Sequence, residues 1–370
     1  MKIIVIGAGA SGITAAINLK RKNPNDEILI IEHLDKPLKK ILATGNGKCN
    51  LGHKNIDFSE YNNPAFAKQM IGDFDYEKFF DSINIKTKLV GDLAYPVSES
   101  AVSVREAFLN ECRKLHIKIN VSEKLLDYKV GEKILVTTDK AAYETDKLIL
   151  AGGLISSSKL GSDGSVIEIL RKHNYKIDEM NPGLSPLLTK EKTKEIDGTR
   201  VKANVKLIVE NKEVHEESGE VLFKDHGLSG IVIFNTMSHI SRLNKNNTII
   251  VLDLLPDYSD EYLANYLIEH SINELLLAFV NPKISQYLKE RFHNENELAK
   301  SIKNLEFTFD KSYGYKFSQV TVGGINVNEV NEHLESVKEK NVYIIGELLN
   351  IDGPCGGYNL TWAFASGLKI

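Results

Sequence analysis

The sequence has little cysteine, no excess of one charge and no hydrophobic stretch long enough to cross a membrane. Its three cysteines in 370 residues are too few for a disulfide framework and are typical of a reducing cytoplasm. Lys and Arg number 46 against 50 Asp and Glu, which gives a net charge of -4. No block of like charge stands out, so we expect no nucleic-acid partner and no membrane partner. The ten histidines lack the paired spacing of metal ligands, and we expect no metal.

The apolar run at the start of the chain predicts a buried strand rather than a secretory signal. Glycines recur inside it at a fixed spacing and no cleavage pattern follows, so we expect a cytoplasmic protein. Lys2–Ile6 has the β-branched composition of a buried parallel strand, Ala10–Arg21 that of a helix, and Ile28–Ile31 that of a second strand. A strand, a glycine turn, a helix and a strand form a βαβ unit whose strands are parallel neighbours.

The turn of this unit carries the G-x-G-x-x-G fingerprint of a dinucleotide site. Gly7 permits the tight turn, Gly9 leaves room for a pyrophosphate, and Gly12 lets the helix pack on the strand. Glu32 follows 20 residues after the last glycine, where its carboxylate can accept from ribose hydroxyls and would repel a 2′-phosphate, which disfavours NADP. The alternative is a tight βα turn without a ligand. The candidate residues are Gly7, Gly9, Ala10, Ser11, Gly12 and Glu32.

Two segments near the C-terminus favour FAD over NAD. Residues 342–347 form an apolar strand that ends in a glycine and a carboxylate, which is suited to accept from a ribityl hydroxyl. Residues 352–360 form a glycine turn leading into a helix, whose N-terminus would stabilise negative charge at the pyrimidine end of a flavin. An NAD enzyme needs no second glycine-rich helix start, whereas a longer, two-ended cofactor does. The candidates are Gly346, Glu347, Asp352, Gly356, Gly357, Tyr358, Asn359 and Leu360.

A segment rich in glycine and amides, residues 38–50, is predicted to wrap the pyrophosphate and the flavin edge. Lys40 or Lys48 would add positive charge there; the alternative is a flexible basic surface loop. Cys49 and Cys355 both lie in cofactor segments, but Cys49 lacks the neighbouring cysteine of dithiol flavoenzymes, so we expect small packed residues rather than a redox pair. The candidates are Lys40, Thr44, Gly45, Gly47, Cys49 and Asn50, joined by Ala151 and Gly152 after a predicted strand at Lys147–Leu150.

The middle of the chain has a different texture. Alternating apolar and polar residues over 201–209, continued at 220–223 and 248–252, predict antiparallel strands with one wet face. Residues 260–305 carry apolar side chains at helical spacing. We therefore predict an α/β protein with a Rossmann-like FAD domain built from both chain ends (1–187 and 317–370). A β-barrel-like insert (188–256 and 306–316) would carry a small helical domain (257–305).

Several long motifs make the chain similar to a known family. They are GAGASG, LKKILATGNGKCN, AYPVSESA, LGSDGS, GEVLFKDHGLSG, TVGGI and GELLNIDGPCGGYNLTWAFASG. Together they resemble, nearly end to end, the bacterial flavoprotein family known as BaiN-like or YhiN-like. The resemblance implies a three-domain FAD protein; the family includes an aminoacetone oxidase and a bile-acid enone reductase. Two departures stand out: Ala151-Gly152-Gly153-Leu154 replaces Ala-Thr-Gly-Gly, and Lys48 replaces an arginine, which weakens any bidentate role.

These motifs predict an oxidoreductase with non-covalent FAD that transfers a hydride at flavin N5 to or from a small organic substrate. No second nucleotide fingerprint is seen, which favours an oxidase acting on an aminoacetone-like amine. An enone reductase with NAD(P)H as a transient reductant, and a non-enzymatic redox sensor, stay open; the lack of a basic stripe disfavours a tRNA-modifying flavoprotein. We expect the substrate over the flavin, between cofactor domain and insert, near Tyr95, Gly227–Gly230 and Tyr358. The sequence names no catalytic base and no oligomeric state.

Overall fold

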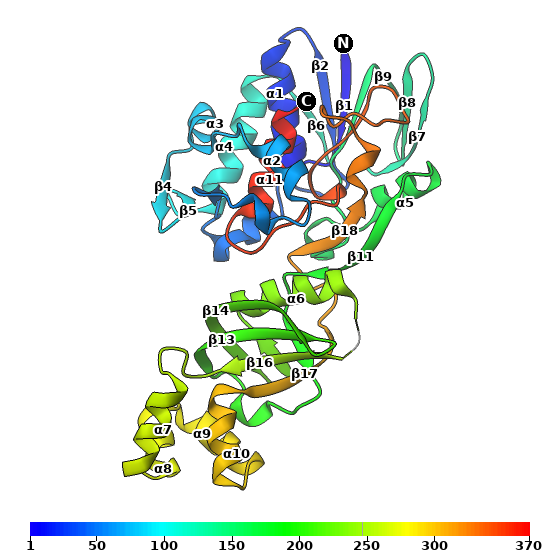
Figure 1. Cartoon of the computed structure of the whole chain (residues 1–370). Coiled ribbons are helices and arrows are strands. Elements are labelled where there is room, and N and C mark those ends of the chain that lie inside the picture. The colour runs from blue at the N-terminus through cyan, green and yellow to red at the C-terminus, as the bar shows by residue number, and fades with distance from the viewer. Residues whose placement is uncertain (246) are drawn as a thin grey trace. The chain divides into compact units, whose positions relative to one another are not determined.

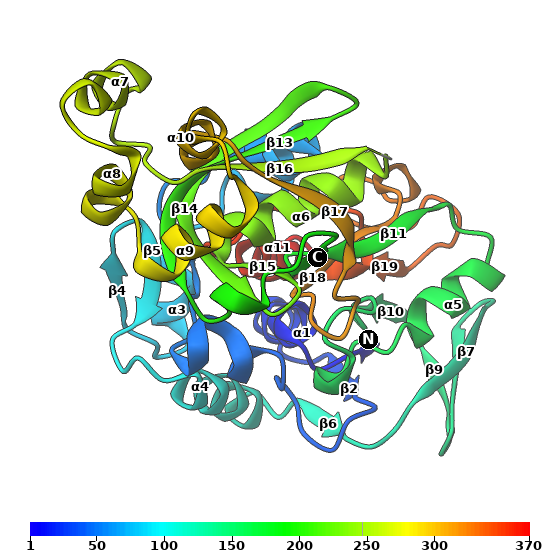
Figure 2. The ribbon, with the colours of Figure 1, turned by 90° about the horizontal axis from the view of Figure 1, so that it is seen from below.

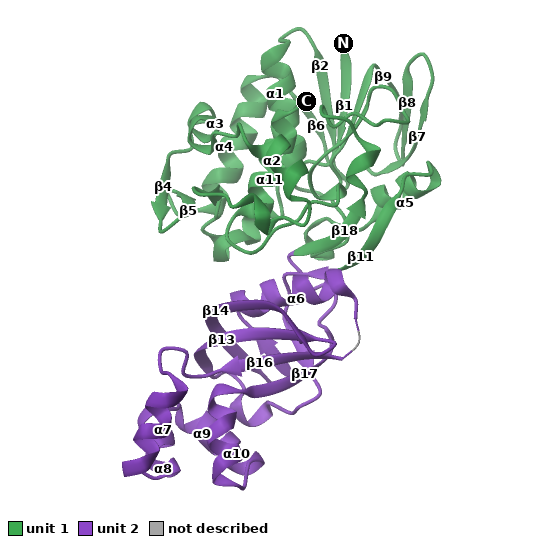
Figure 3. Ribbon diagram, viewed as in Figure 1, with its two compact units in different colours: residues 1–181, 320–370 green, residues 182–319 purple. Residues whose placement is uncertain are grey.

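The computed structural model describes residues 1–245 and 247–370 and divides them into two compact units. The first contains residues 1–181 and 320–370, and the second contains residues 182–319 (Figure 3). The chain leaves the first unit along β11 (Ile177–Gly183) and returns at β18 (Val320–Ile325), and these two strands pair with each other. The finer division into an FAD domain, a β-rich insert and a helical insert stays a prediction.

A five-stranded parallel sheet forms the centre of the first unit (Figure 1). Ile6 lies opposite Leu150 on one side and Ile31 on the other, so the strand ends are level. Most side chains of these five strands are buried, because a parallel sheet of this class is covered on both faces. The strands are therefore short runs rich in β-branched residues. The strand order is β19 (Val342–Ile344), β10 (Lys147–Leu150), β1 (Lys2–Ile6), β2 (Glu27–Ile31) and β6 (Lys118–Asn120).

Two helices from opposite ends of the chain, α1 (Ala10–Lys22) and α11 (Tyr358–Leu368), pack side by side (Figure 1). Their contact is close because Gly367 has no side chain: an added Cβ would lie 2.6 Å from the carbonyl oxygen of Ser11. Phe364 of α11 stacks on Phe108 of α4 (Ala101–Lys114), with ring centroids 5.8 Å apart. This unit also contains α2 (Pro64–Ile71), α3 (Tyr76–Ser82) and α5 (Ser165–Lys172).

Two small antiparallel sheets and several short helices complete the first unit. One sheet has the order β3 (Gly52–His53), β5 (Leu93–Pro96) and β4 (Thr87–Val90). The other has the order β7 (Leu125–Val130), β8 (Ile134–Thr138) and β9 (Ala142–Thr145). The 3-10 helices are η1 (Ile41–Gly47), η2 (Phe58–Glu60), η3 (Ser158–Leu160), η5 (Val327–Glu329) and η6 (Gly346–Leu348).

The second unit is built on a closed barrel. Along one of its strands Ala203, Val205, Leu207 and Val209 are buried while the residues between them are partly exposed, the alternation of a sheet with one wet face. α6 (Ile231–Leu243) packs on β14, and η4 (Lys194–Ile196) lies in a connection. The barrel order is β12 (Leu187–Thr189), β15 (Gly227–Ser229), β14 (Lys212–Lys224), β13 (Arg200–Val209), β16 (Thr248–Asp253) and β17 (Leu305–Ser312).

Four helices of the second unit gather beside the barrel, with α10 against β16 and β17, α9 against η4, and α7 and α8 farther out (Figure 2). Their bounds are Asp260–Glu269 for α7, Ile272–Phe279 for α8, Pro282–Arg291 for α9 and Glu295–Lys303 for α10. Each begins after a side-chain oxygen that accepts from a first-turn N–H, at Ser259, Ser271, Asn281 and Asn294. These caps divide the continuous helical pattern of the sequence into four separate helices.

The predicted fold class is confirmed: the protein is α/β, with a Rossmann-like parallel sheet from both chain ends and a six-stranded barrel. Leu187, which directly precedes the predicted start of the insert, pairs with β15 and β17 inside the barrel.

Candidate functional site

Four strand ends of the parallel sheet bring predicted cofactor residues to one edge. Gly7 follows β1, Glu32 follows β2, Ala151 follows β10, and Gly346 comes shortly after β19. Backbone hydrogen bonds of 2.8–3.0 Å keep these ends level with the neighbouring strands. Open parallel sheets bind their ligands outside the carboxyl ends of the strands, so this edge is the candidate site.

The turn after β1 fits a dinucleotide. Gly7 has φ +100°, and an added Cβ would lie 2.5 Å from the carbonyl oxygen of Ala151, while a Cβ on Gly12 would overlap the carbonyl oxygen of Gly7. A Cβ on Gly9 would meet no atom within 4 Å, so open space lies where the fingerprint predicts the phosphates. α1 has no acidic residue in its first turn and no side-chain cap, which leaves its first N–H groups for an anion.

Glu32 is held at the end of β2 by backbone donors. Its Oε2 accepts from the N–H of Ala8 (2.7 Å) and its Oε1 from the N–H of Leu34 (2.9 Å). The residue is buried, and the Nδ1 of His33 lies 3.2 Å from Oε1. Because an ionised carboxylate offers about four acceptor positions, capacity remains for ribose hydroxyls.

Glu347 lies in a hydrogen-bonded cluster whose members come from distant parts of the chain. Its Oε1 accepts from the Oγ of Ser156 (2.6 Å) and from the N–H of Thr321 (3.0 Å), and its Oε2 accepts from the Nζ of Lys40 (2.9 Å). The Nζ of Lys40 also donates to the Oγ of Ser156 (3.1 Å). The sequence predicts Lys40 and Glu347 as site residues but misses Ser156 and Thr321. For Thr321 the TVGGI motif that begins at this residue was the available signal.

Residues 41–50 form a tight turn next to this cluster. Gly45 has φ +56°, and an added Cβ would lie 2.9 Å from the nitrogen of Asn50. Gly47 has φ +85°, and its Cβ would meet no atom within 4 Å, so it borders open space as Gly9 does. The Nζ of Lys48 is engaged by Glu99 at 3.0 Å. Of the two lysines considered for this segment, Lys40 is therefore the one directed at a predicted cofactor residue.

Cys49 is a buried, packed residue of the same turn. It has no exposed surface and φ +60°. Burial, opposed by a hydrogen bond with Thr44, raises the pKa of its thiol to about 11. None of Cys49, Cys112 and Cys355 forms a disulfide bond within residues 1–245 and 247–370. A thiol held in the protonated form is a poor nucleophile, so the geometry of Cys49 favours a packing role.

The glycine turn before α11 is fastened by Asn359. Its Oδ1 accepts from the N–H of Gly353 (3.1 Å), and its Nδ2 donates to the carbonyl oxygen of Gly353 (2.8 Å). Gly356 and Gly357 have φ +111° and +100°, and a Cβ on Gly357 would lie 2.5 Å from the carbonyl carbon of Gly52. No side chain caps the N-terminus of α11, which leaves its first N–H groups available.

Tyr358 is packed rather than open. It is 7% exposed, and its ring lies 5.3 Å from the ring of His53 and 5.4 Å from that of Tyr61. Burial raises the pKa of its hydroxyl. Asp352 is buried and donates its N–H to Asn62 (3.0 Å). The remaining predicted residues are Ala10 and Ser11 in the first turn of α1, Thr44 and Asn50 in the 41–50 turn, Ala151 and Gly152 after β10, and Leu360 in the first turn of α11.

The expected substrate-wall residues belong to different units. Tyr95 lies in β5 of the first unit, and Gly227–Ser229 is β15 in the barrel; the expected substrate position stays a prediction. Within residues 1–245 and 247–370, no three His, Cys, Asp or Glu side chains are grouped to hold a metal ion. Over the same residues, no helix has the length and apolar character needed to span a membrane.

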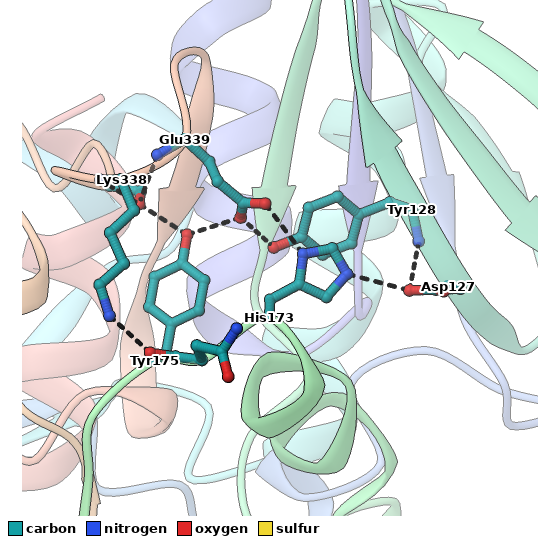
Figure 4. A network of polar contacts seen from close by, with 8 residues as sticks. Asp127, Tyr128, His173, Tyr175, Lys338 and Glu339 are labelled. Atoms are coloured by element: carbon teal, nitrogen blue, oxygen red, sulfur yellow. Dashed lines mark hydrogen bonds and ion pairs between the residues drawn. The ribbon is translucent and has the colours of Figure 1, made fainter.

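A second polar network of the first unit centres on Glu339 (Figure 4). Its Oε2 accepts from the hydroxyls of Tyr128 (2.5 Å) and Tyr175 (2.8 Å), and its Oε1 lies 2.8 Å from the Nδ1 of His173. The Nε2 of His173 lies 3.0 Å from Asp127, and its ring stacks on that of Tyr128 at 4.1 Å. The network ties β7 and the end of α5 to the segment that precedes β19.

The level strand ends, the glycine cradle with its acidic partner, and the second glycine-rich helix start define a dinucleotide-binding α/β protein suited to FAD. The HI0933-like protein Rossmann domain family matches residues 1–370, and the chain belongs to this family. It is an FAD-dependent oxidoreductase, and the predictions of family, cofactor and enzyme class are confirmed.

Three curated relatives align with nearly the whole chain. A 3-dehydro-bile acid delta(4,6)-reductase of Clostridium scindens is 32% identical over 99% of this chain and 97% of its own length. Ribosomal RNA dihydrouridine synthases of Escherichia coli and Haemophilus influenzae are 26% and 25% identical, over 98% of this chain and 95% and 96% of their lengths. Among solved structures, a 3-ketosteroid delta1-dehydrogenase from Sterolibacterium denitrificans aligns with a TM-score of 0.49 and 9% identity, over 99% of this chain and 98% of that chain.

Proposed function

We propose that this protein is a reductase that adds hydrogen across a carbon–carbon double bond conjugated to a carbonyl group, with NAD(P)H as a transient reductant. The observation that carries the proposal is the 32% identity, over nearly the whole chain, to a bile-acid reductase. The names of the other two relatives support the same bond class, because forming dihydrouridine saturates the uracil double bond that is conjugated to a carbonyl. In each case a hydride goes to the electron-poor carbon of the conjugated double bond and a proton goes to the other carbon of that bond.

An oxidase is the second candidate. The sequence shows no second nucleotide fingerprint, which favours oxygen over a dedicated nicotinamide domain as the partner of the flavin. In that case an aminoacetone-like amine would lose a hydride, and oxygen would accept the electrons. The two candidates differ in the direction of hydride transfer at the substrate.

The proposed cofactor contacts follow the edge of the sheet. Glu32 would hold the adenosine ribose, the open space over Gly9 at the N-terminus of α1 would take the pyrophosphate, and Glu347 would accept from the ribityl chain. Open space next to Gly9 and Gly47 supports this assignment. FAD, when bound, supplies hydride transfer at N5. The uncapped N-terminus of α11 would stabilise negative charge at the pyrimidine end of the flavin.

Anaerobic reduction of the holoprotein tests the proposal. NADH, NADPH and aminoacetone are added in parallel while the visible flavin absorbance is followed. The reduced protein is then mixed with a conjugated steroid ketone, cyclohexenone, a uridine-rich RNA or oxygen. Cyclohexanone, which keeps the carbonyl but lacks the double bond, is the matched control.

If the protein is a reductase, we expect NADH or NADPH to bleach the flavin absorbance. The reduced flavin should then be reoxidised faster by a conjugated acceptor than by cyclohexanone or oxygen. If the RNA is the acceptor that works, the bond class stands and the substrate is a nucleic acid. Bleaching by aminoacetone alone would replace the reductase by the oxidase. No bleaching by any donor would remove both.

A further inference from the structure

The TVGGI motif forms β18, a fully buried strand that lies close to two neighbours. Gly323 has φ +98°, and an added Cβ would overlap the carbonyl oxygen of Glu179 in β11. Gly324 has φ +121°, and its Cβ would lie 2.8 Å from the carbonyl oxygen of Leu348 in η6. The two successive glycines therefore let β18 lie close to both β11 and η6, and Thr321 of the same strand contacts Glu347 of η6.

Thr321 holds both Glu347 and the turn that carries Ser156. Its N–H donates to the Oε1 of Glu347 (3.0 Å). Its Oγ1 accepts from the N–H groups of Ser156 (3.1 Å) and Ile155 (3.4 Å). Ser156 has no exposed surface, and its Oγ donates to the same Oε1 at 2.6 Å. The two residues thus supply both donors to one oxygen of the carboxylate.

The hydrogen-bonding capacity of Glu347 is unequal between its two oxygens. A carboxylate oxygen has two lone pairs. Oε1 receives two donors, from Ser156 and Thr321, whereas Oε2 receives one, from Lys40. Counting the donors from residues 1–245 and 247–370, one acceptor position therefore remains, and it is on Oε2.

We propose that Ser156 and Thr321 are positioning residues for the cofactor: by saturating Oε1 of Glu347, they orient Oε2 so that its remaining lone pair accepts from one ribityl hydroxyl of FAD. The inference rests on the proposed contact between Glu347 and the ribityl chain. It is independent of whether the enzyme works as a reductase or as an oxidase. Lys40 would balance the charge of the same carboxylate without filling the open position.

FAD binding to the apoprotein tests this directly, with no turnover involved. Dissociation constants are measured by fluorescence titration for FAD and for a set of FAD analogues that each lack one ribityl hydroxyl. The variants are Ser156→Ala, Thr321→Val and the conservative Thr321→Ser. Thr193→Val is the matched control, because the Oγ1 of Thr193 also accepts from a backbone N–H, that of Gly227 (3.0 Å), but in the second unit.

Wild type is expected to bind one of the analogues at least about tenfold more weakly than FAD, the effect of one hydrogen bond to a charged group. Ser156→Ala removes the Oγ donor to Oε1 of Glu347, so it should weaken FAD by about the same factor and cause little further loss with that analogue. Thr321→Val keeps the N–H donor to Glu347 and should weaken FAD indirectly, because it removes the hydroxyl that holds the turn of Ser156. Thr321→Ser should restore wild-type affinity, and Thr193→Val should leave it unchanged.

Two results would overturn the inference. One is wild-type FAD affinity in Ser156→Ala and Thr321→Val. The other is an equal loss for FAD and every analogue, which would indicate a general structural defect rather than orientation of Oε2. If Thr321→Val does not fold, Ser156→Ala decides the question on the same measurements, because it removes the Oγ donor to Oε1 directly.

Discussion

Replacing His173 by glutamine should destabilise the first unit most at mildly acidic pH, and the loss should shrink as the pH rises. Burial alone would lower the pKa of His173, but the hydrogen bonds and charges of Glu339 and Asp127 outweigh it and raise the pKa above its ordinary value. A group whose pKa is raised in the folded state contributes stability that is complete below its unfolded pKa, about 6.5. That contribution disappears as the pH rises through the folded pKa.

The magnitude follows from the two carboxylates that His173 contacts. The side chain of Asp127 is 60% exposed, so its ion pair contributes at most about 1 kcal/mol. The side chain of Glu339 is 19% exposed, and a hydrogen bond between charged groups in such a site contributes about 1.5–3 kcal/mol. Glutamine can keep one neutral hydrogen bond, which recovers about 1 kcal/mol. We therefore expect a net loss of about 2 kcal/mol near pH 6, carried mainly by Glu339.

Urea unfolding of wild type and His173→Gln at intervals from pH 6 to pH 9 measures this loss. Taking the difference between the two proteins cancels the titration of all other groups. His226→Gln is the control, since the His226 side chain is 64% exposed in the second unit, and it should change stability by less than about 0.5 kcal/mol. A difference that stays constant over the whole range, or that grows with pH, would refute the reasoning.

Three further predictions concern single positions. Gly9→Ala should fold like wild type but bind FAD at least about tenfold more weakly. Gly12→Ala should instead destabilise the apoprotein, because its Cβ would overlap the carbonyl oxygen of Gly7. Urea unfolding measures the loss of stability, and FAD titration measures the loss of affinity. Burial and the charges of His215 and Arg242 lower the pKa of His239 to about 4. The free energy of unfolding of the second unit should therefore fall by up to about 1.4 kcal/mol per pH unit as the pH drops below about 6.5. In urea titrations, His239→Asn should abolish this slope. In the native apoprotein at mildly alkaline pH, Cys49 and Cys112 should resist a thiol reagent until the chain unfolds, because burial raises their pKa values to about 11 and 12.

Local sequence patterns were sufficient to predict where the strands end at the candidate cofactor edge of the parallel sheet. A buried parallel strand reads as a short β-branched run, and the glycine or carboxylate that follows it stands at a fixed place in the fold. Gly7, Glu32 and Glu347 were therefore predictable, although they come from opposite ends of the chain. The Rossmann-like sheet followed from the same patterns, since a βαβ unit admits one handedness.

Other features depend on contacts that no local spacing records. In the sequence Ser156 lies 191 positions from Glu347 and 165 positions from Thr321, yet it contacts both. A lone hydroxyl in a loop, such as that of Ser156, has no sequence pattern of its own. Tyr358 directly follows a glycine turn, and this position suggested that it lies beside the substrate. In the structure Gly357 has a left-handed conformation, and the ring of Tyr358 packs on that of His53. The helical region shows the opposite case: Ser271 and Glu274 form a capping box whose spacing was visible in the sequence.

The two carboxylates of the candidate cofactor edge, Glu32 and Glu347, are held in different ways, and this difference has a consequence for how the proposed cofactor would be held. Glu32 is fixed by the backbone N–H groups of Ala8 and Leu34, which remain when side chains are substituted. Glu347 is fixed partly by the side chains of Lys40 and Ser156, so substitutions there can reorient it without disturbing the sheet. Because rigid support of a binding group decides how well it is positioned, we expect the adenosine end to tolerate sequence change around it. The flavin end should then be the part of the edge where single side chains tune how the cofactor is held.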